Sequence, residues 1–275
     1  MPYTERTFRF EGTTVSYLEG GSGCPVLLLH GSGPGASSLG NWRPILEPLA
    51  EKFHVFAMDL IGFGNSGRRA ITPYFDVDLW FRQGTHMISL MPGASIGVLG
   101  HSLSGMLALR LAASHPRISG VMTTATMGAP FVINEATVRC WTFPETVEEL
   151  RAVGCALTYD NSLINETYIS TRKRILYDDP SYGEYFRSMF SGDKQSFVDA
   201  VILAPEELGR ITCPVTMLHG RNDVAFPPTI TLDIARYLPQ ADVVLVSRCS
   251  HSIAMESSER FLYESSRLFG RISRP

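Results

Sequence analysis

The sequence predicts an α/β protein in which helices cover both faces of a mostly parallel central sheet. Short apolar segments, such as 26–29, 95–99 and 214–220, alternate with longer segments of helical character. Parallel strands are buried on both faces, so they are typically continuous apolar runs rather than alternating ones. The chain has 275 residues, 44% of them hydrophobic, which is enough for a substantial core with one inserted subdomain.

The elements before the first functional motif follow one another in this order. An opening hairpin is expected to turn at Glu11-Gly12. A buried strand, a helix capped by Asn41, a second strand, another helix and a third strand come next. The expected ranges are 7–10 and 14–19 for the hairpin, then 26–29, 42–52, 54–59, 78–91 and 95–99. A further helix at 106–113 and a strand at 120–125 complete this half of the predicted sheet.

The pattern changes between about Met127 and Leu208. This stretch holds the helix-like segments 144–154, 163–176 and 181–191 but has no obvious core strand, and core strands resume at Pro214. The sequence therefore predicts a core formed by 1–127 and 209–275, with 128–208 inserted as a helical lid. Lids exclude water and shape substrate pockets. The alternative is that the insertion forms only a dimer surface.

A serine follows the strand 95–99 at a sharp turn. Gly100-His101-Ser102-Leu103-Ser104-Gly105 connects that strand directly to the helix 106–113. A serine at such a strand-to-helix turn is typical of the nucleophile in acyl-transfer enzymes. The turn exposes the hydroxyl, and the N-terminus of the helix faces the reacting oxygen.

A serine nucleophile needs a base and an acid that orients the base, and in this architecture the acid precedes the histidine. Asp223 follows the strand 214–220, and His251 follows the strand 241–246. Both lie at the carboxyl ends of strands, where open α/β sheets bind ligands. We therefore expect a catalytic triad of Ser102, Asp223 and His251. Taken singly, these residues could be a capping serine, a turn aspartate and a surface histidine.

The loop His30-Gly31-Ser32-Gly33-Pro34-Gly35 follows the strand 26–29. A histidine-glycine loop at this place supplies one main-chain N–H group to an oxyanion hole, and the residue after the nucleophile supplies the other. We therefore assign the oxyanion donors to the main chains of Ser32 and Leu103. The alternative, a phosphate-binding loop, lacks its Lys-Ser/Thr after the last glycine.

Composition narrows the classes of partner. The net charge of −3 gives no basic footprint for nucleic acid. No apolar run approaches the roughly 20 residues of a membrane helix, and the N-terminus has no secretory apolar region. The five cysteines are scattered, without a C-x-x-C pair. We expect free thiols in a reducing cytoplasm, a small-molecule substrate, and neither a metal nor a cofactor.

Longer motifs are more specific than the serine turn. They are His30-Gly31-Ser32-Gly33-Pro34-Gly35-Ala36, Gly40-Asn41-Trp42-Arg43, 59–66 and 159–166. Over nearly its whole length the chain resembles the α/β-hydrolase superfamily. Within it, the chain is most similar to the meta-cleavage-product hydrolases of bacterial aromatic degradation, which cut a carbon–carbon bond in 2-hydroxy-6-oxo-dienoates made by extradiol ring cleavage.

The resemblance implies a substrate site and an expected homodimer. Arg172 stands at the position of the family's lid arginine, where a guanidinium gives the substrate carboxylate a bidentate partner. Asn41 would position the dienol end, and Gly33, His101 and Ser252 would also contact substrate. The alternative for Arg172 is a solvated helix charge beside Lys173 and Arg174, and for Asn41 it is helix capping.

The chain departs from the family pattern at three positions. His101 replaces the usual asparagine, Ser104 the usual glycine, and Ser252 the tryptophan that normally follows the catalytic histidine. A carboxylesterase or lactonase on the same scaffold is therefore one alternative function. A non-enzymatic small-molecule binding protein of this fold is a second.

Overall fold

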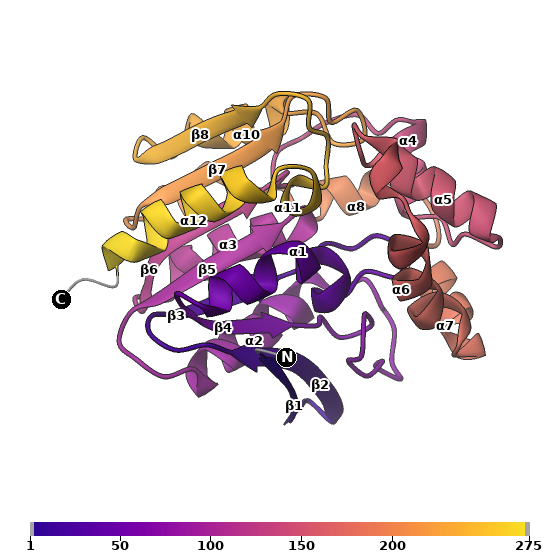
Figure 1. Cartoon of the computed structure of the whole chain (residues 1–275), viewed down its shortest axis with the longest axis horizontal. Helices are drawn as coiled ribbons and strands as arrows, with labels where there is room; N and C mark the ends of the chain where they lie inside the picture. Colours follow the sequence, from indigo (N-terminus) through magenta and orange to yellow (C-terminus); the bar gives the residue numbers. More distant parts are fainter. Residues whose placement is uncertain (1–2, 273–275) are drawn as a thin grey trace.

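The computed structural model describes residues 3–272, which form one eight-stranded sheet with helices on both faces (Figure 1). The strand order is β1-β2-β4-β3-β5-β6-β7-β8. The pairs β1–β2 and β2–β4 are antiparallel, and the strands from β4 to β8 in this order are parallel to their neighbours. The strands are β1 Tyr3–Phe10, β2 Thr13–Gly20, β3 Pro25–Leu29, β4 His54–Met58, β5 Ile96–His101, β6 Ile118–Thr124, β7 Val215–Gly220 and β8 Ala241–Val246. The predicted fold class is confirmed.

The expected opening hairpin is also confirmed. Phe10 pairs with Thr13, so Glu11 and Gly12 form a two-residue turn. Both have positive φ, 44° and 78°, which is the turn geometry that suits the right-handed twist of the two strands.

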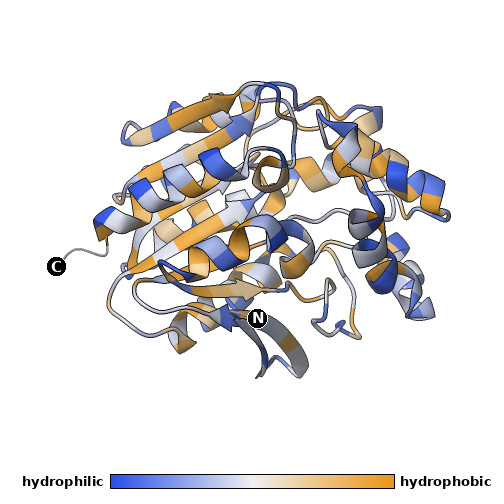
Figure 2. Cartoon of the chain, in the orientation of Figure 1, coloured by the Kyte–Doolittle hydropathy of each residue, from blue (hydrophilic) through white to orange (hydrophobic). Residues whose placement is uncertain are grey.

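The sheet separates two hydrophobic layers because successive side chains of a strand point to opposite faces. Val26 and Leu28 of β3 pack with the helices α1 and α12 on one face. Leu27 and Leu29 pack with α2 and α3 on the other. Figure 2 shows that the central strands are mostly hydrophobic and that the helices around them carry both hydrophilic and hydrophobic residues. The core helices are α1 Ser38–Ala50, α2 Val77–Leu90, α3 Leu103–Ser114, α10 Thr229–Ala235, α11 Ile253–Glu256 and α12 Ser258–Ile272.

The first core helix begins earlier than predicted. The Ser37 hydroxyl accepts a hydrogen bond of 3.0 Å from Gly40 N, so α1 starts at Ser38 and is capped by Ser37. The expectation that Asn41 caps this helix is wrong, because Asn41 lies inside its first turns. The side chain of Asn41 is thereby free for another role.

In the described chain the segment between β6 and β7 is helical, without a strand. Its helices are α4 Glu135–Cys140, α5 Val147–Ala156, the 3-10 turn η1 Asn161–Leu163, α6 Glu166–Tyr177, α7 Pro180–Met189, α8 Gln195–Asp199 and α9 Pro205–Leu208. Figure 1 shows α4 to α7 gathered at one end of the sheet. The helix predicted over 163–176 begins three residues later, at Glu166, because Asn165 caps it through a hydrogen bond of 3.1 Å from Tyr168 N. The lid role of 128–208 stays a prediction.

None of the helices within residues 3–272 is long and apolar enough to span a bilayer. The expected cytoplasmic location and homodimer stay predictions.

Candidate active site

Ser102 lies at the turn between β5 and α3 in a strained main-chain conformation. Its φ and ψ are 57° and −123°, a region that residues other than glycine rarely adopt and that is typical of a nucleophile elbow. Its main-chain N–H donates to the carbonyl oxygen of Thr124 at 2.9 Å, which ties the turn to β6. A Cβ at Gly100 would lie 2.0 Å from the Ser104 carbonyl oxygen. The tight approach of strand and helix therefore requires a glycine there.

The expected acid and base are hydrogen-bonded. His251 Nδ1 lies 2.7 Å from Asp223 Oδ2, and both residues are buried. Phe226 N donates to the other carboxylate oxygen at 2.9 Å. Burial alone would raise the pKa of Asp223, but the charge of His251 and the hydrogen bonds from His219 and His251 outweigh it, so this pKa lies below its usual range. An ionised Asp223 holds the proton of His251 on Nδ1, which leaves Nε2 free to act as a base.

A second histidine supports the same carboxylate, and the sequence interpretation missed it. His219 Nε2 lies 3.3 Å from Asp223 Oδ2 and 2.9 Å from the carbonyl oxygen of Phe226. A carbonyl oxygen only accepts, so Nε2 carries the proton. His219 is fully buried near the end of β7. The available signal was a histidine within the mostly apolar strand 214–220.

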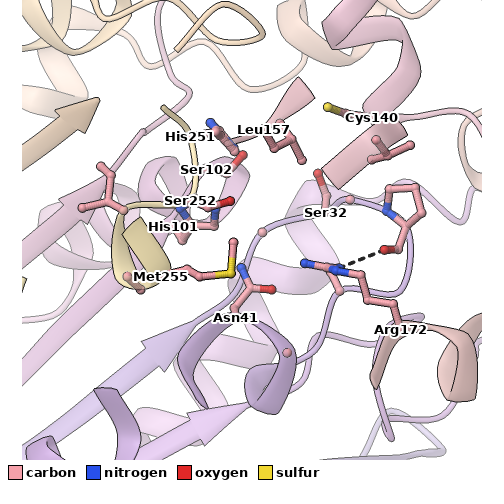
Figure 3. Close-up of a pocket in the computed structure, with 18 of the residues that line it drawn as sticks. Ser32, Asn41, His101, Ser102, Cys140, Leu157, Arg172, His251, Ser252 and Met255 are labelled. Atoms are coloured by element: carbon pink, nitrogen blue, oxygen red, sulfur yellow. Dashed lines mark hydrogen bonds between the residues drawn. The ribbon is translucent and has the colours of Figure 1, made fainter. Parts of the chain in front are cut away.

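Ser102 and His251 line one pocket, and Figure 3 shows them next to each other. The pocket is narrow, with about 60 Å³ open to water-sized molecules. Its polar lining comes from the loops after β3, β5 and β8 and from α6, and its apolar lining includes Trp141, Val153, Leu157, Phe226 and Met255. The loops at the carboxyl ends of the strands thus meet the inserted helices at this pocket.

The expected oxyanion loop borders the same pocket. Leu103 is the first residue of α3, so its N–H has no acceptor inside the helix. Ser32 follows β3, and its hydroxyl accepts a hydrogen bond of 3.2 Å from Trp141 Nε1. His30 connects this loop to the segment after β4. Its Nδ1 donates to the Gly31 carbonyl at 2.6 Å, and its Nε2 accepts from Leu60 N at 3.0 Å. Gly33 also lines the pocket.

Arg172 and Asn41 both reach the pocket. Arg172 Nη1 donates to the Pro34 carbonyl at 2.9 Å (Figure 3). Its guanidinium lies 4.6 Å from the centre of the Tyr168 ring. Its neighbours Lys173 and Arg174 are exposed, whereas Arg172 is partly buried. The Oδ1 atom of Asn41 is buried and has no hydrogen-bond partner in the described part of the chain. It is an acceptor that lacks a donor.

His101 presents a second open acceptor. Its Nδ1 lies 3.1 Å from both the carbonyl oxygen and the hydroxyl of Thr124. Because the carbonyl only accepts, Nδ1 carries the proton and Nε2 has a free lone pair. Burial and then the charge of His251 lower the pKa of His101 well below its usual value, so the ring is neutral. Its ring centre lies 4.8 Å from that of His251, and the residue lines the pocket.

Ser252 lines the pocket directly after His251. Its main-chain N–H donates to the Leu157 carbonyl at 3.2 Å, at the end of α5. The structure thus brings together all ten residues expected in the site. They are Ser32, Gly33, Asn41, His101, Ser102, Leu103, Arg172, Asp223, His251 and Ser252.

Comparison with known proteins places this site in a class. The family described as "Alpha/beta hydrolase family" matches residues 26–262, and the chain therefore belongs to that family. More particularly, the chain is 28% identical over 251 residues to the 2-hydroxymuconate semialdehyde hydrolase of Pseudomonas sp. (strain CF600), covering 91% of this chain and 88% of that protein.

Two solved structures are similar over nearly their full length. The meta-cleavage product hydrolase of Pseudomonas fluorescens IP01, crystallised as a serine-to-alanine variant with acetates, has a TM-score of 0.91 and 26% identity, covering 98% of each chain. The 2-hydroxy-6-oxo-6-phenylhexa-2,4-dienoate hydrolase of Rhodococcus sp. strain RHA1 has a TM-score of 0.88 and 27% identity, covering 98% of this chain and 99% of that chain. The resemblance drawn from the sequence and the interpretation as an enzyme, a hydrolase, are confirmed.

Proposed function

We propose that this hydrolase cleaves a carbon–carbon bond in 2-hydroxy-6-oxo-dienoates, the ring-fission products of aromatic degradation. The observation that carries the proposal is the position of Arg172. A guanidinium in a narrow pocket, held by Pro34 and facing the same space as Ser102, is suited to a substrate with a carboxylate. The similarity to hydrolases that are named for dienoates supports the same substrate class.

The polar groups of the pocket match the rest of such a substrate. A 2-hydroxy-dienoate carries an enol hydroxyl next to its carboxylate. In the proposal Arg172 binds the carboxylate, and one of the two open acceptors, Asn41 Oδ1 or His101 Nε2, accepts a hydrogen bond from the enol hydroxyl. Gly33 and Ser252 border the bound dienoate. The apolar side chains Trp141, Val153 and Phe226 surround the less polar part of the substrate.

The reaction proceeds in two stages. In the first stage the proton of the 2-hydroxyl group is moved to C5, which gives the 2-oxo form. The new carbonyl group at C2 later stabilises the negative charge on the fragment that leaves at C5. His251, held by Asp223, then accepts the proton of Ser102 as the serine oxygen attacks the 6-oxo carbon, or the proton of a water molecule if water attacks instead. The main-chain N–H groups of Ser32 and Leu103 stabilise the oxyanion. Cleavage of the C5–C6 bond with one water gives a 2-hydroxy-dienoate and a carboxylic acid, and uses no cofactor.

The inserted helices act as the lid in this proposal. Arg172 comes from α6, Trp141 follows α4, and Leu157 follows α5, so the insertion supplies both the charged and the apolar walls. Movement of this segment admits the substrate, and its return excludes water from the reacting groups.

The alternative is a carboxylesterase or lactonase that uses the same triad. Ser252 is the observation in its favour, because the residue that borders the dienoate in this proposal is a small polar side chain instead of an indole. An ester needs the serine, the base and the oxyanion donors but offers no carboxylate to Arg172.

A substrate panel separates the two functions. Ring-fission products with hydrogen, methyl and phenyl at the ketone end are assayed by loss of their visible absorbance, and p-nitrophenyl acetate and a simple lactone serve as controls. We expect turnover of at least one dienoate with a kcat/KM above that of either control. Brisk ester cleavage without turnover of any dienoate contradicts the proposal and favours the alternative.

A further inference from the structure

The carboxylate of Glu256, the last residue of α11, joins two distant segments of the chain. Its Oε1 accepts a hydrogen bond of 2.9 Å from Ser250 N. Its Oε2 accepts from Tyr159 N at 2.5 Å and from Asp160 N at 3.3 Å. Hydrogen bonds from N–H groups to a carboxylate are among the stronger ones in proteins. One side chain therefore fastens the loop of the candidate base to the turn between α5 and η1.

Both chain neighbours of His251 are linked to this turn. Ser250 is linked through Glu256, and Ser252 donates directly to the Leu157 carbonyl at 3.2 Å. The loop that carries Asp223 is tied in as well, since Asn222 N donates to the Cys249 carbonyl at 2.9 Å. The loops of the candidate acid and the candidate base and the segment 157–160 are thus connected by one network of hydrogen bonds, made by main-chain groups and the Glu256 carboxylate.

The opposite side of the insertion is held differently. The helix α6 is joined to α1 by a hydrogen bond of 3.0 Å between exposed groups of Arg43 and Thr171. The start of α7 is joined to the core by an ion pair of 2.7 Å between Arg68 and Asp179, whose side chain is half exposed. Exposed pairs of this kind contribute little to stability. Buried side chains of α7, among them Tyr182, Phe186 and Met189, also pack this side against the core. The two sides of the insertion therefore differ in the kind of attachment, with main-chain hydrogen bonds to one carboxylate on the α5–η1 side and side-chain contacts on the other.

We propose that Glu256 is a positioning residue that holds His251 and the α5–η1 turn as one body. The inference rests on the proposed function only in taking His251 as the base. Loss of the Glu256 carboxylate lets Ser250 and the turn separate, and His251 then samples positions away from Ser102. The substrate contacts of Arg172 and Asn41 are not altered.

The test compares Glu256→Gln with a matched control, Glu259→Gln, an exposed glutamate at the start of α12. The glutamine keeps the size of the side chain but replaces one accepting oxygen with a donor, which opposes the main-chain N–H groups. We expect kcat to fall about tenfold or more with KM within about twofold, for a dienoate and for p-nitrophenyl acetate alike, because small displacements of a catalytic group are costly. The control should behave as the wild type.

Hydrogen exchange provides the second readout. In Glu256→Gln the amides of 157–160 and 249–252 should exchange faster together, and those of 166–189 should not change. A raised KM with unchanged kcat, or faster exchange in only one of the two segments, overturns the inference. If the dienoate is not turned over, the proposed substrate class is wrong, and the kinetics with p-nitrophenyl acetate still test the role of Glu256.

If Glu256→Gln does not fold, hydrogen exchange of the wild-type protein provides the test. The inference requires that the amides of Tyr159, Asp160 and Ser250, which donate to Glu256, are protected from exchange to a similar degree. Fast exchange at one of the two segments with strong protection of the other contradicts it.

Discussion

Asp223 and His251 are joined by a hydrogen bond of 2.7 Å between Oδ2 and Nδ1, and both side chains are buried. The bond fixes the tautomer of the histidine, so Nε2 is left without a proton on the side of the pocket. His219 Nε2 contacts the same carboxylate oxygen at 3.3 Å. The proposed reaction depends on this arrangement, because a base in the wrong tautomer cannot receive the serine proton.

The first prediction concerns this pair. Asp223→Asn should lower kcat by about 10³-fold or more, since the amide would no longer hold the proton of His251 on Nδ1. Steady-state kinetics measure the effect, with Asp78→Asn as a control at an exposed aspartate of α2. A loss smaller than about tenfold contradicts the assignment of Asp223 as the orienting acid.

The second prediction concerns the nucleophile. Ser102→Ala should lose about 10³-fold or more of its activity and still bind substrate, because the binding groups Arg172 and Asn41 remain. Binding is followed by the change in the substrate's visible spectrum. The matched control is Ser89→Ala, an exposed serine of α2. Retention of more than about a tenth of the activity removes Ser102 from the mechanism.

The third prediction compares two neighbouring cations of α6. Arg172→Ala should cost about 2–4 kcal/mol in kcat/KM for a dienoate, as expected when a desolvated charge pair loses one partner. The same variant should barely affect p-nitrophenyl acetate, which has no carboxylate. Lys173→Ala changes an exposed charge one residue away and should leave both activities unchanged. Equal small effects on both substrates would make Arg172 a structural residue.

The fourth prediction concerns stability and pH. Burial lowers the pKa of His30 and of His101 in the folded protein. An unfolded histidine titrates near about 6.5, so below that pH the unfolded chain binds more protons than the folded one. The stability that these two neutral side chains contribute is therefore present above about pH 6.5 and decreases as the pH falls toward their lower folded values.

Urea unfolding midpoints between pH 7.5 and 5.0 measure this dependence. The midpoint should fall as the pH is lowered, and His101→Asn should make the curve shallower because one of the two groups is removed. Parallel curves for the variant and the wild type would show that His101 does not carry a lowered pKa in the folded state.

Most of the fold and of the candidate site could be predicted from patterns that are local in the sequence. The apolar runs 26–29, 95–99 and 214–220 are strands of the parallel sheet because burial on both faces requires continuous apolar residues. The motif around Ser102 needs a glycine on its strand side and a helix after it, and both features are local in sequence. The order of Ser102, Asp223 and His251 follows from the order of the strands that precede them.

The missed features depend on contacts between distant segments. The cap at Ser37 displaced the predicted start of α1, since several polar residues near the start could serve as caps. His219 is a strand residue by sequence, and its bond to Asp223 appears only when the loop after β7 folds back. The same holds for Glu256, whose partner Tyr159 is 97 positions away. Side chains that bind main-chain groups of remote loops leave no periodic signal.

The most direct test of the proposed function is the steady-state hydrolysis of 2-hydroxy-6-oxohepta-2,4-dienoate by the wild-type protein, followed by loss of visible absorbance and by identification of the products. We expect 2-hydroxypenta-2,4-dienoate and acetate in equal amounts, at a kcat/KM above that for p-nitrophenyl acetate. An unchanged dienoate spectrum, with hydrolysis of the ester that Ser102→Ala abolishes, would contradict the carbon–carbon hydrolase and identify an esterase.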